Sequence, residues 1–307
     1  MLCARQRLLL LKPKITCEEA IKLLNDFALG PLNDVQNAIP HSGSPDYFPL
    51  LKTAVVKYDR LTEEMMRTMR PVFAGEQVAG RARSGRYRFI MSAEMAGGNV
   101  DTLLYAELDE LRRYLTYDLA NELREQQERY RHHEGRRTLV LDGNDALHYS
   151  RFDKIPWAKL YGGACVIVWP HVIVDEIDAK GYSTGSESIR RRARGVYRLF
   201  EQLQDEMDEK GYATLQDGTI VEIVADAIDH VRLSNNDNEA VACAGRLQQC
   251  LGPGRVNVIT RDIGVRARAR SWALRAKPLP ERYLIPGGGF TAKELDAALA
   301  EITSPHD

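Results

Sequence analysis

The chain has 307 residues, of which 44% are hydrophobic, a content typical of a folded globular protein. Its 42 lysines and arginines nearly balance its 43 acidic residues, so any attraction to nucleic acid must come from local patches of charge and not from the net charge. The five cysteines form no C-x-x-C pair, which predicts free thiols and excludes a structural zinc of the usual spacing. No apolar run has the length of a signal peptide or a membrane span, so we expect a cytoplasmic protein with no membrane partner.

The first part of the chain, residues 1–135, is predicted to form an all-α domain. Thr16 and Glu19 have the spacing of a capping box, in which the two residues cap each other at a helix start. A row of leucines then keeps one apolar face over several helical turns: Leu104, Leu108, Leu111, Leu115, Leu119 and Leu123. The basic stretch GRARSGRYRF, from Gly80, predicts a loop or short strand between the helices. No motif in this half indicates a role.

The charged stretch ERYRHHEGRR marks the expected boundary to a second domain. After it, the runs TLVLD, ACVIVWP and RVNVIT are short, apolar and β-rich, as parallel strands buried on both faces are. Helical stretches separate these runs, and YATLQDGTIVEIV predicts a hairpin around Asp217 and Gly218. We therefore expect an α/β domain over residues 136–285, with a central parallel sheet and ligands at the carboxyl ends of its strands. Residues 286–307 are expected to form a glycine hinge followed by a C-terminal helix.

Four carboxylates fall where this architecture places ligands. Asp142 and Asp262 each end a predicted strand, in LVLDGND and VITRD. Glu176 lies in the first turns of the helix after the second strand, and Asp237 lies in the first turn of another helix. Each acid alone has an ordinary structural explanation, because carboxylates cap helices and favour their positive ends. Together they would repel, by roughly 3 kcal/mol for a pair about 5 Å apart at an effective dielectric of 20. We therefore expect Mg²⁺ or Mn²⁺ to bind among them.

An acidic cluster of this kind is typical of phosphodiester hydrolysis, because a divalent ion acidifies water and stabilises charge on a phosphate. Asn144 and Thr260 are expected to support a ligand or phosphate from behind the acids. Positive charge must flank the acids if nucleic acid is to bind. Two helices carry suitable arginines: Arg190, Arg191 and Arg194 on one, Arg266 and Arg270 on the other. A solvated charged face is the alternative explanation for each of these arginines.

These motifs resemble the PIN-domain nucleases. LVLDGN, PHVIVDEID, NNDNEAVACA and VITRDIGVRARA occur in the family's order over residues 138–284, and the last two are similar in particular to the larger bacterial PIN domains. The resemblance implies a Rossmann-like three-layer α/β/α sandwich, dependence on Mg²⁺ or Mn²⁺, and cleavage of single-stranded RNA. The family's acids correspond here to Asp142, Glu176, Asp237 and Asp262. The sequence departs from the family pattern at three positions. Gly143 replaces the usual hydroxyl residue, Asp145 replaces an apolar residue, and Ala240 is smaller than the usual aliphatic residue.

The sequence thus predicts a metal-dependent endoribonuclease. Asp142 and Asp262 are the expected principal metal ligands, and Glu176 and Asp237 complete the site or position the attacking water. A structure-specific DNA nuclease and a non-catalytic RNA-binding module on the same fold are the alternatives. A phosphotransferase is disfavoured, since DGND lacks the D-x-D arrangement of a nucleophilic aspartate.

The resemblance also bears on protein partners. PIN-type domains frequently pair through their helices, which implies a homodimer. The sequence leaves open whether an inhibitory protein partner binds the chain, although the toxins of toxin/antitoxin pairs are usually much shorter than this chain.

Overall fold

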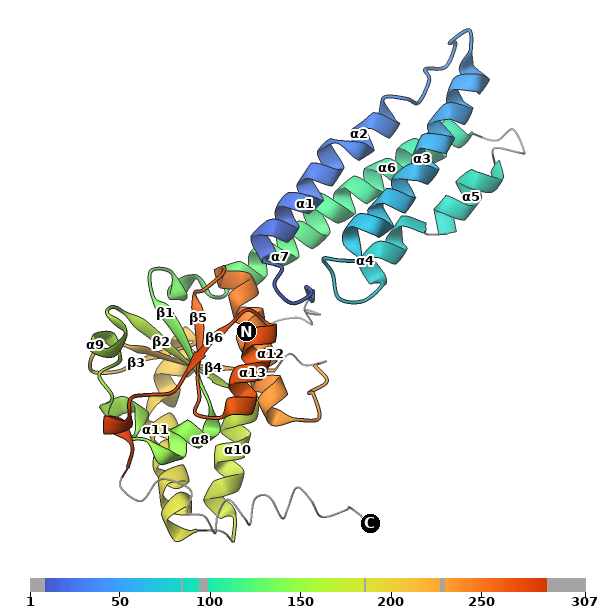
Figure 1. Cartoon of the computed structure of the whole chain (residues 1–307). Coiled ribbons are helices and arrows are strands. Elements are labelled where there is room, and N and C mark those ends of the chain that lie inside the picture. The colour runs from blue at the N-terminus through green and yellow to red at the C-terminus, as the bar shows by residue number, and fades with distance from the viewer. Residues whose placement is uncertain (1–8, 84, 94–98, 185, 227–229, 286–307) are drawn as a thin grey trace, which may run out of the picture. The chain divides into compact units, whose positions relative to one another are not determined.

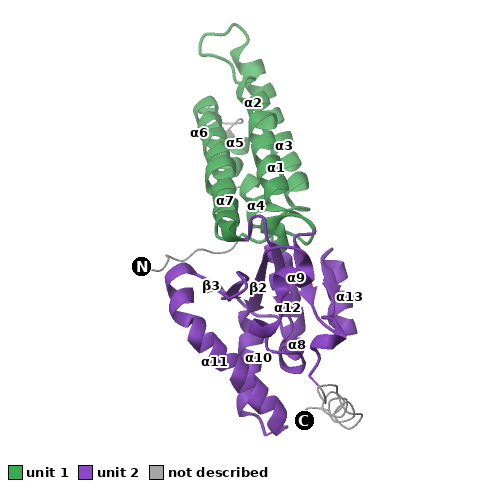
Figure 2. Ribbon diagram, turned by 90° about the vertical axis from the view of Figure 1, so that its left-hand side faces the viewer, with its two compact units in different colours: residues 1–132, 248–253 green, residues 133–247, 254–307 purple. Residues whose placement is uncertain are grey.

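The structure is a computed structural model, and its contacts divide the chain into two compact units (Figure 2). The first unit comprises residues 1–132 and 248–253, and the second comprises residues 133–247 and 254–307. The residues that the structure describes are 9–83, 85–93, 99–184, 186–226 and 230–285. The glycine hinge and C-terminal helix expected over residues 286–307 lie outside this described part. Among the described helices, none combines the length and the apolar character that crossing a membrane requires.

The first unit is helical, which confirms the prediction for this half (Figure 1). Thr16 and Glu19 form the predicted capping box, and all six leucines of the predicted apolar row are buried. A π-helical turn, η2 (Tyr114–Leu119), interrupts this row without exposing it. The other helices of the unit are α1 (Cys17–Leu29), α2 (Pro31–Gln36), α3 (Tyr47–Met69), α4 (Gln77–Gly80), η1 (Arg81–Arg83), α5 (Gly85–Ala93), α6 (Val100–Arg113) and α7 (Ala120–Glu128).

The basic stretch from Gly80 forms η1 and α5, so the predicted loop or strand was wrong. Two of its arginines, Arg81 and Arg86, form ion pairs with acids of α6. Arg81 contacts Glu107 at 3.4 Å and Glu110 at 2.5 Å, and Arg86 contacts the same two carboxylates at 3.1 and 2.7 Å. Because Glu107 is fully buried, its charge needs these partners, and they hold the basic segment against α6.

The second unit is a mostly parallel sheet flanked by helices, which confirms the predicted α/β class. The strands are β1 (Arg137–Leu141), β2 (Cys165–Pro170), β3 (Ala213–Thr214), β4 (Ile220–Val224), β5 (Val256–Ile259) and β6 (Arg275–Lys277). Strands β3 and β4 form the predicted antiparallel hairpin, with Gly218 at a φ of 80° in its turn. The helices are α8 (Gly143–His148), α9 (Trp157–Tyr161), α10 (His171–Tyr182), α11 (Glu187–Lys210), α12 (Asn236–Leu251) and α13 (Ile263–Ser271), with short turns η4 (Phe152–Lys154) and η5 (Glu281–Tyr283). The turn η3 (Arg131–His133) spans the boundary between the two units, and the last residues of α12 belong to the first.

The strand order, β3-β4-β2-β1-β5-β6, creates a switch point between β1 and β5. From β1 the chain moves outward to β2 and β4, and it then returns to β5 on the other side of β1. With right-handed crossovers, α10 and α11 cover one face of the sheet, and α12 and α13 cover the other (Figure 1). Leu141 lies opposite Ile259 in the register, so the residues that follow these strands emerge side by side. In open α/β sheets, this is where ligands bind.

Close packing fixes the two helices on the second face. A Cβ atom on Gly245 of α12 would lie 2.2 Å from Cε3 of Trp272, which follows α13. Only glycine leaves room for the indole ring at this position. The contact brings α12 and α13, which carry two of the predicted acids near their first turns, into a fixed arrangement.

Candidate active site

Asp142 and Asp262 leave the two strands at the switch point, and Thr260 connects them. The Thr260 hydroxyl donates to Oδ2 of Asp142 at 2.6 Å and accepts from the Asp262 N–H at 3.0 Å. Each acid also caps the helix that follows it: Oδ1 of Asp142 accepts from the N–H of Asn144 at 3.2 Å, and Oδ1 of Asp262 accepts from the N–H of Val265 at 2.9 Å. These bonds fix the direction of both carboxylates.

The predicted acids share one electrostatic environment. Burial raises the pKa of Asp142 above its ordinary value, hydrogen bonds oppose the rise, and the charges of Asp237 and Glu176 add to it. Burial also raises the pKa of Asp237, a neighbouring arginine opposes the rise, and the charges of Asp262 and Glu176 add to it. The fold therefore brings the four carboxylates close enough to repel one another.

Glu176 reaches this cluster from α10. A Cβ atom at Gly143 would lie 3.3 Å from Oε2 of Glu176, so the missing side chain at this position leaves room for the carboxylate. Lys180, one turn later on α10, donates to Oε1 of Glu176 at 2.5 Å and to Oδ1 of Asn144 at 3.1 Å. Lys180 thereby balances the charge of Glu176 and orients the Asn144 amide.

Asp237 has a counter-cation of its own. The Arg268 guanidinium on α13 lies 2.5 Å from Oδ2 of Asp237, and about a third of each side chain is exposed, 36% and 35%. Within the described part of the chain, no three of the four predicted acids bring oxygens within 4.8 Å of one another. The four carboxylates therefore lie apart from one another, and two cations, Lys180 and Arg268, pair with Glu176 and Asp237.

The donor set of this cluster suits a hard divalent cation. The four acids offer carboxylate oxygens, which such cations prefer. Magnesium is usually held by one or two carboxylates and several waters, so an open cluster is compatible with its binding. Asp142 and Asp262, joined by Thr260, are the pair that could hold the ion, and Glu176 and Asp237 could complete its surroundings.

A second group of potential ligands lies beyond the end of β4. Asp226, His230 and Glu239 each bring one donor atom to within 4.8 Å of the others. Glu239 is buried, and it accepts from His230 at 2.9 Å and from the N–H of Leu233 at 2.9 Å. Asp226 is paired with Arg232 at 2.5 Å. Because these contacts satisfy the group internally and anchor the segment before α12, we interpret it as structural.

Asp145, an acid at a usually apolar position, lies behind Asp142. It is only 3% exposed, its Oδ1 accepts from the N–H of Arg261 at 3.3 Å, and its buried Oδ2 has no hydrogen-bond partner among the described residues. Burial raises the pKa of Asp145 to about 7, and the charge of Asp142 adds to the rise, whereas Arg261 and Arg266 oppose it. Asp145 therefore keeps its proton to a higher pH than an ordinary carboxyl group does.

The predicted arginine patches lie in different surroundings. On α11, Arg190 is paired with Glu187, and Arg191 is exposed. On α13, Arg270 is exposed, whereas Nε of Arg266 is buried and has no hydrogen-bond partner within the described chain.

The two cations that reach the acids, Lys180 and Arg268, were missed in the sequence. The spacing of Lys180, four residues after Glu176 on a helix, is a signal that could have identified it. Arg268 is one of three alternating arginines on α13, and only the packing of α12 against α13 shows which of them faces Asp237.

We predict that Asp145→Asn raises the free energy of unfolding at pH 8, by up to about 4 kcal/mol for a shift of three pKa units, and that the gain disappears toward pH 4. The pKa of Asp145 is about 7 in the folded chain and about 3.9 in an unfolded one. The folded state therefore binds the proton more tightly, and its stability falls as the pH rises between these values. Asparagine has no proton to lose and keeps the bond to Arg261.

Urea unfolding at pH 4, 6 and 8 in EDTA measures this difference. Asp205→Asn, which removes an exposed carboxylate on α11, is the control and should leave the pH profile unchanged. A stability difference between Asp145→Asn and the native chain that is the same at all three pH values would contradict the assignment.

Comparison with known proteins agrees with the fold and the order of the motifs. Residues 139–279 match the family model of the PIN domain, a region that begins in β1 and ends just after β6. All four predicted acids lie within it, and no curated protein matches the chain. PIN domains are generally nucleases. Residues 139–279, in the C-terminal half of this chain, are therefore a PIN domain, and the helices α1 to α7 precede the match in the sequence.

Proposed function

We propose that the chain is a metal-dependent endoribonuclease that hydrolyses phosphodiester bonds of single-stranded RNA. One observation carries the proposal: Thr260 joins Asp142 and Asp262 at the switch point of a PIN-domain sheet. Helix capping alone does not explain the two negative charges at this position, since asparagine caps a helix as well as aspartate does. A divalent cation supplies a reason for both charges.

Asp142 and Asp262 would hold Mg²⁺ or Mn²⁺, with Glu176 and Asp237 completing the site. When bound, such an ion acidifies water and stabilises charge on the phosphate. Glu176 and Asp237 keep 21% and 35% of their side chains exposed, so they are suited to accept a hydrogen bond from the attacking water. The water oxygen bonds to phosphorus and gives up a proton to one of these two carboxylates, the bond from phosphorus to a ribose oxygen breaks, and that oxygen takes up a proton.

Lys180 and Arg268 would bind the substrate. In the free chain they neutralise Glu176 and Asp237. A divalent cation that binds the acids would replace Lys180 and Arg268 as their counter-ions. The two side chains could then pair with phosphate oxygens of the strand. RNA as the substrate rests on the resemblance of the four motifs to PIN-domain nucleases, most of which cleave single-stranded RNA.

The native chain should cleave fluorescent single-stranded RNA with Mn²⁺ or Mg²⁺ and not with EDTA. Asp142→Asn and Asp262→Asn should each lower the rate at least about 100-fold, because loss of metal binding removes several kcal/mol of transition-state stabilisation. Gel analysis of the products, with Asp208→Asn of α11 as an exposed-carboxylate control, measures the effect.

A matched DNA strand completes this experiment. If DNA is cut as fast as RNA, the structure-specific DNA nuclease replaces the ribonuclease. If RNA binds and neither strand is cut, the chain is a binding module. Unchanged rates in both Asn variants would remove these two acids from the site.

We predict that Arg268→Gln tightens Mn²⁺ binding about 3- to 5-fold. Arg268 competes with a metal ion for Asp237, and a partly exposed ion pair contributes up to about 1 kcal/mol. Isothermal titration with Mn²⁺ measures the affinity without any need for cleavage. Arg270→Gln, which removes an exposed arginine from the same helix, should leave the affinity unchanged. Weaker binding by Arg268→Gln would mean that the arginine positions Asp237 for the ion and does not compete with it.

A further inference from the structure

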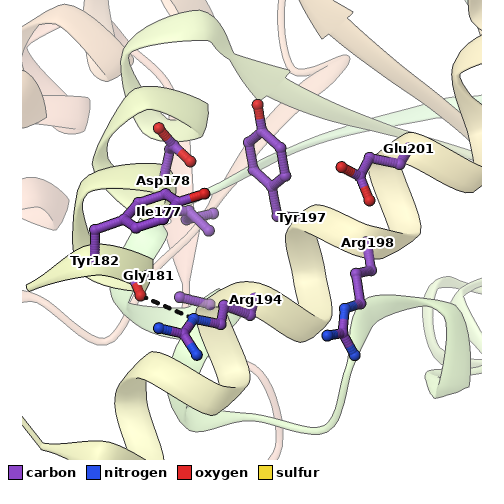
Figure 3. Close-up of a pocket in the computed structure, with 9 residues that line it drawn as sticks. Ile177, Asp178, Gly181, Tyr182, Arg194, Tyr197, Arg198 and Glu201 are labelled. Carbon is purple, nitrogen blue, oxygen red and sulfur yellow. Dashed lines mark hydrogen bonds between the residues drawn. The ribbon is translucent and has the colours of Figure 1, made fainter.

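A cavity of about 190 Å³ lies between α10 and α11, and two exposed tyrosines are among its lining residues (Figure 3). Tyr182, at the end of α10, is 78% exposed, and Tyr197 of α11 is 38% exposed. Ile177 and Gly181 form the floor between the helices. The volume is below the roughly 300 Å³ at which pockets for larger ligands begin. The cavity therefore suits a single planar ring system.

The rims of this cavity carry opposite charges. Figure 3 shows the guanidinium groups of Arg194 and Arg198 on one side of the tyrosine rings and the carboxylates of Asp178 and Glu201 on the other. Nε of Arg194 donates to the carbonyl oxygen of Gly181 at 3.1 Å, which holds this guanidinium at the rim. A ligand with an anionic group at one end and N–H donors at the other matches this arrangement.

The cationic rim continues along α11. Arg191, Arg194 and Arg198 follow an i, i+3, i+7 spacing, which places them on one face of the helix. At 1.5 Å per residue, the first and last of them are separated by about 10 Å along the axis. None of the three forms an ion pair with a carboxylate in the described part of the chain. A row of this length suits several phosphates and not a single one.

We propose that the cavity binds one nucleotide of the single-stranded nucleic acid that the PIN domain cleaves, an inference that rests on the proposed function. The base packs against Tyr182 and Tyr197, and its N–H groups face Asp178 and Glu201. Its phosphate and the neighbouring ones lie along the α11 arginines. Stacking on exposed aromatic side chains beside a cationic groove is how proteins hold single strands with little sequence preference.

Helix α10 relates this subsite to the acids. Glu176 and Lys180 lie on the face that reaches Asn144 and Gly143, whereas Ile177 and Gly181 lie on the face that lines the cavity. A strand that occupies both must pass around α10. The cavity therefore holds a nucleotide at some distance from the bond that is cut. It contributes binding affinity only for a strand long enough to reach both places.

Fluorescence anisotropy tests the subsite with a single-stranded RNA of about 16 nucleotides, long enough for an extended groove, in EDTA. Tyr182→Ala should weaken binding about 5- to 150-fold, the loss expected for one base stack. Tyr182→Phe keeps the ring and should bind as the native chain does. Arg198→Gln should weaken binding and reduce the salt dependence by about one phosphate contact.

Lys210→Gln removes a positive charge from the far end of α11 and is the control, with no expected change. Thermal unfolding verifies that the variants fold, which the exposure of Tyr182 favours. Equal affinity of Tyr182→Ala and the native chain for the RNA would overturn the subsite. AMP that binds the native chain as tightly as the 16-mer would overturn the assignment to a strand, because it would identify a free nucleotide as the occupant.

The two proposals fail separately. Weaker RNA binding by Tyr182→Ala, together with no cleavage by the native chain, would support the subsite and reject the nuclease. Cleavage by the native chain, with unchanged RNA affinity in Tyr182→Ala, would reject the subsite alone.

Discussion

The two hydrogen bonds of the Thr260 hydroxyl hold the site together, because they join the ends of β1 and β5, strands far apart in the sequence. The parallel register brings Leu141 level with Ile259, and the next residues diverge into two helices. Without a connection at this point, Asp142 and Asp262 would be two separate helix caps. With it, the Asp142 carboxylate and the Asp262 backbone share one hydroxyl, and each carboxylate is directed by the helix that it caps. The other two acids lie on α10 and α12.

Charge is balanced around this pair in two ways. Where a long side chain can reach, a cation neutralises the acid: Lys180 pairs with Glu176, and Arg268 pairs with Asp237. Asp145 forms no ion pair among the described residues and holds its proton more tightly instead, since burial raises its pKa to about 7. A divalent ion and a phosphate strand would replace these internal partners. The same arrangement can therefore keep the free chain folded and accept a charged substrate.

The strand ends, and with them the places of Asp142 and Asp262, could be predicted because they depend on local patterns: apolar β-rich runs that end in polar residues. Glu176 and Asp237 could be placed because the starts of α10 and α12 also have local sequence signals. Ion-pair partners could not, because they depend on which helix faces pack together. For that reason GRARSGRYRF was taken for a loop or strand, although Arg81 and Arg86 bind buried Glu107, and Lys180 and Arg268 were not singled out. The end of α12 is a similar case. Gln249, near the end of this helix, donates to the carbonyl of Lys12 and belongs to the first unit, whereas the start of the helix belongs to the second. The helical sequence pattern continues through this change of unit and does not indicate it.

The central claim is that the Asp142–Asp262 pair is the metal site of this PIN domain. Anomalous diffraction from crystals of the full chain grown with Mn²⁺ tests it most directly, because the signal locates the ion without reference to activity. The account predicts a peak within coordination distance of carboxylate oxygens of both Asp142 and Asp262. A peak at Asp226, His230 and Glu239, with none at the switch point, would contradict it.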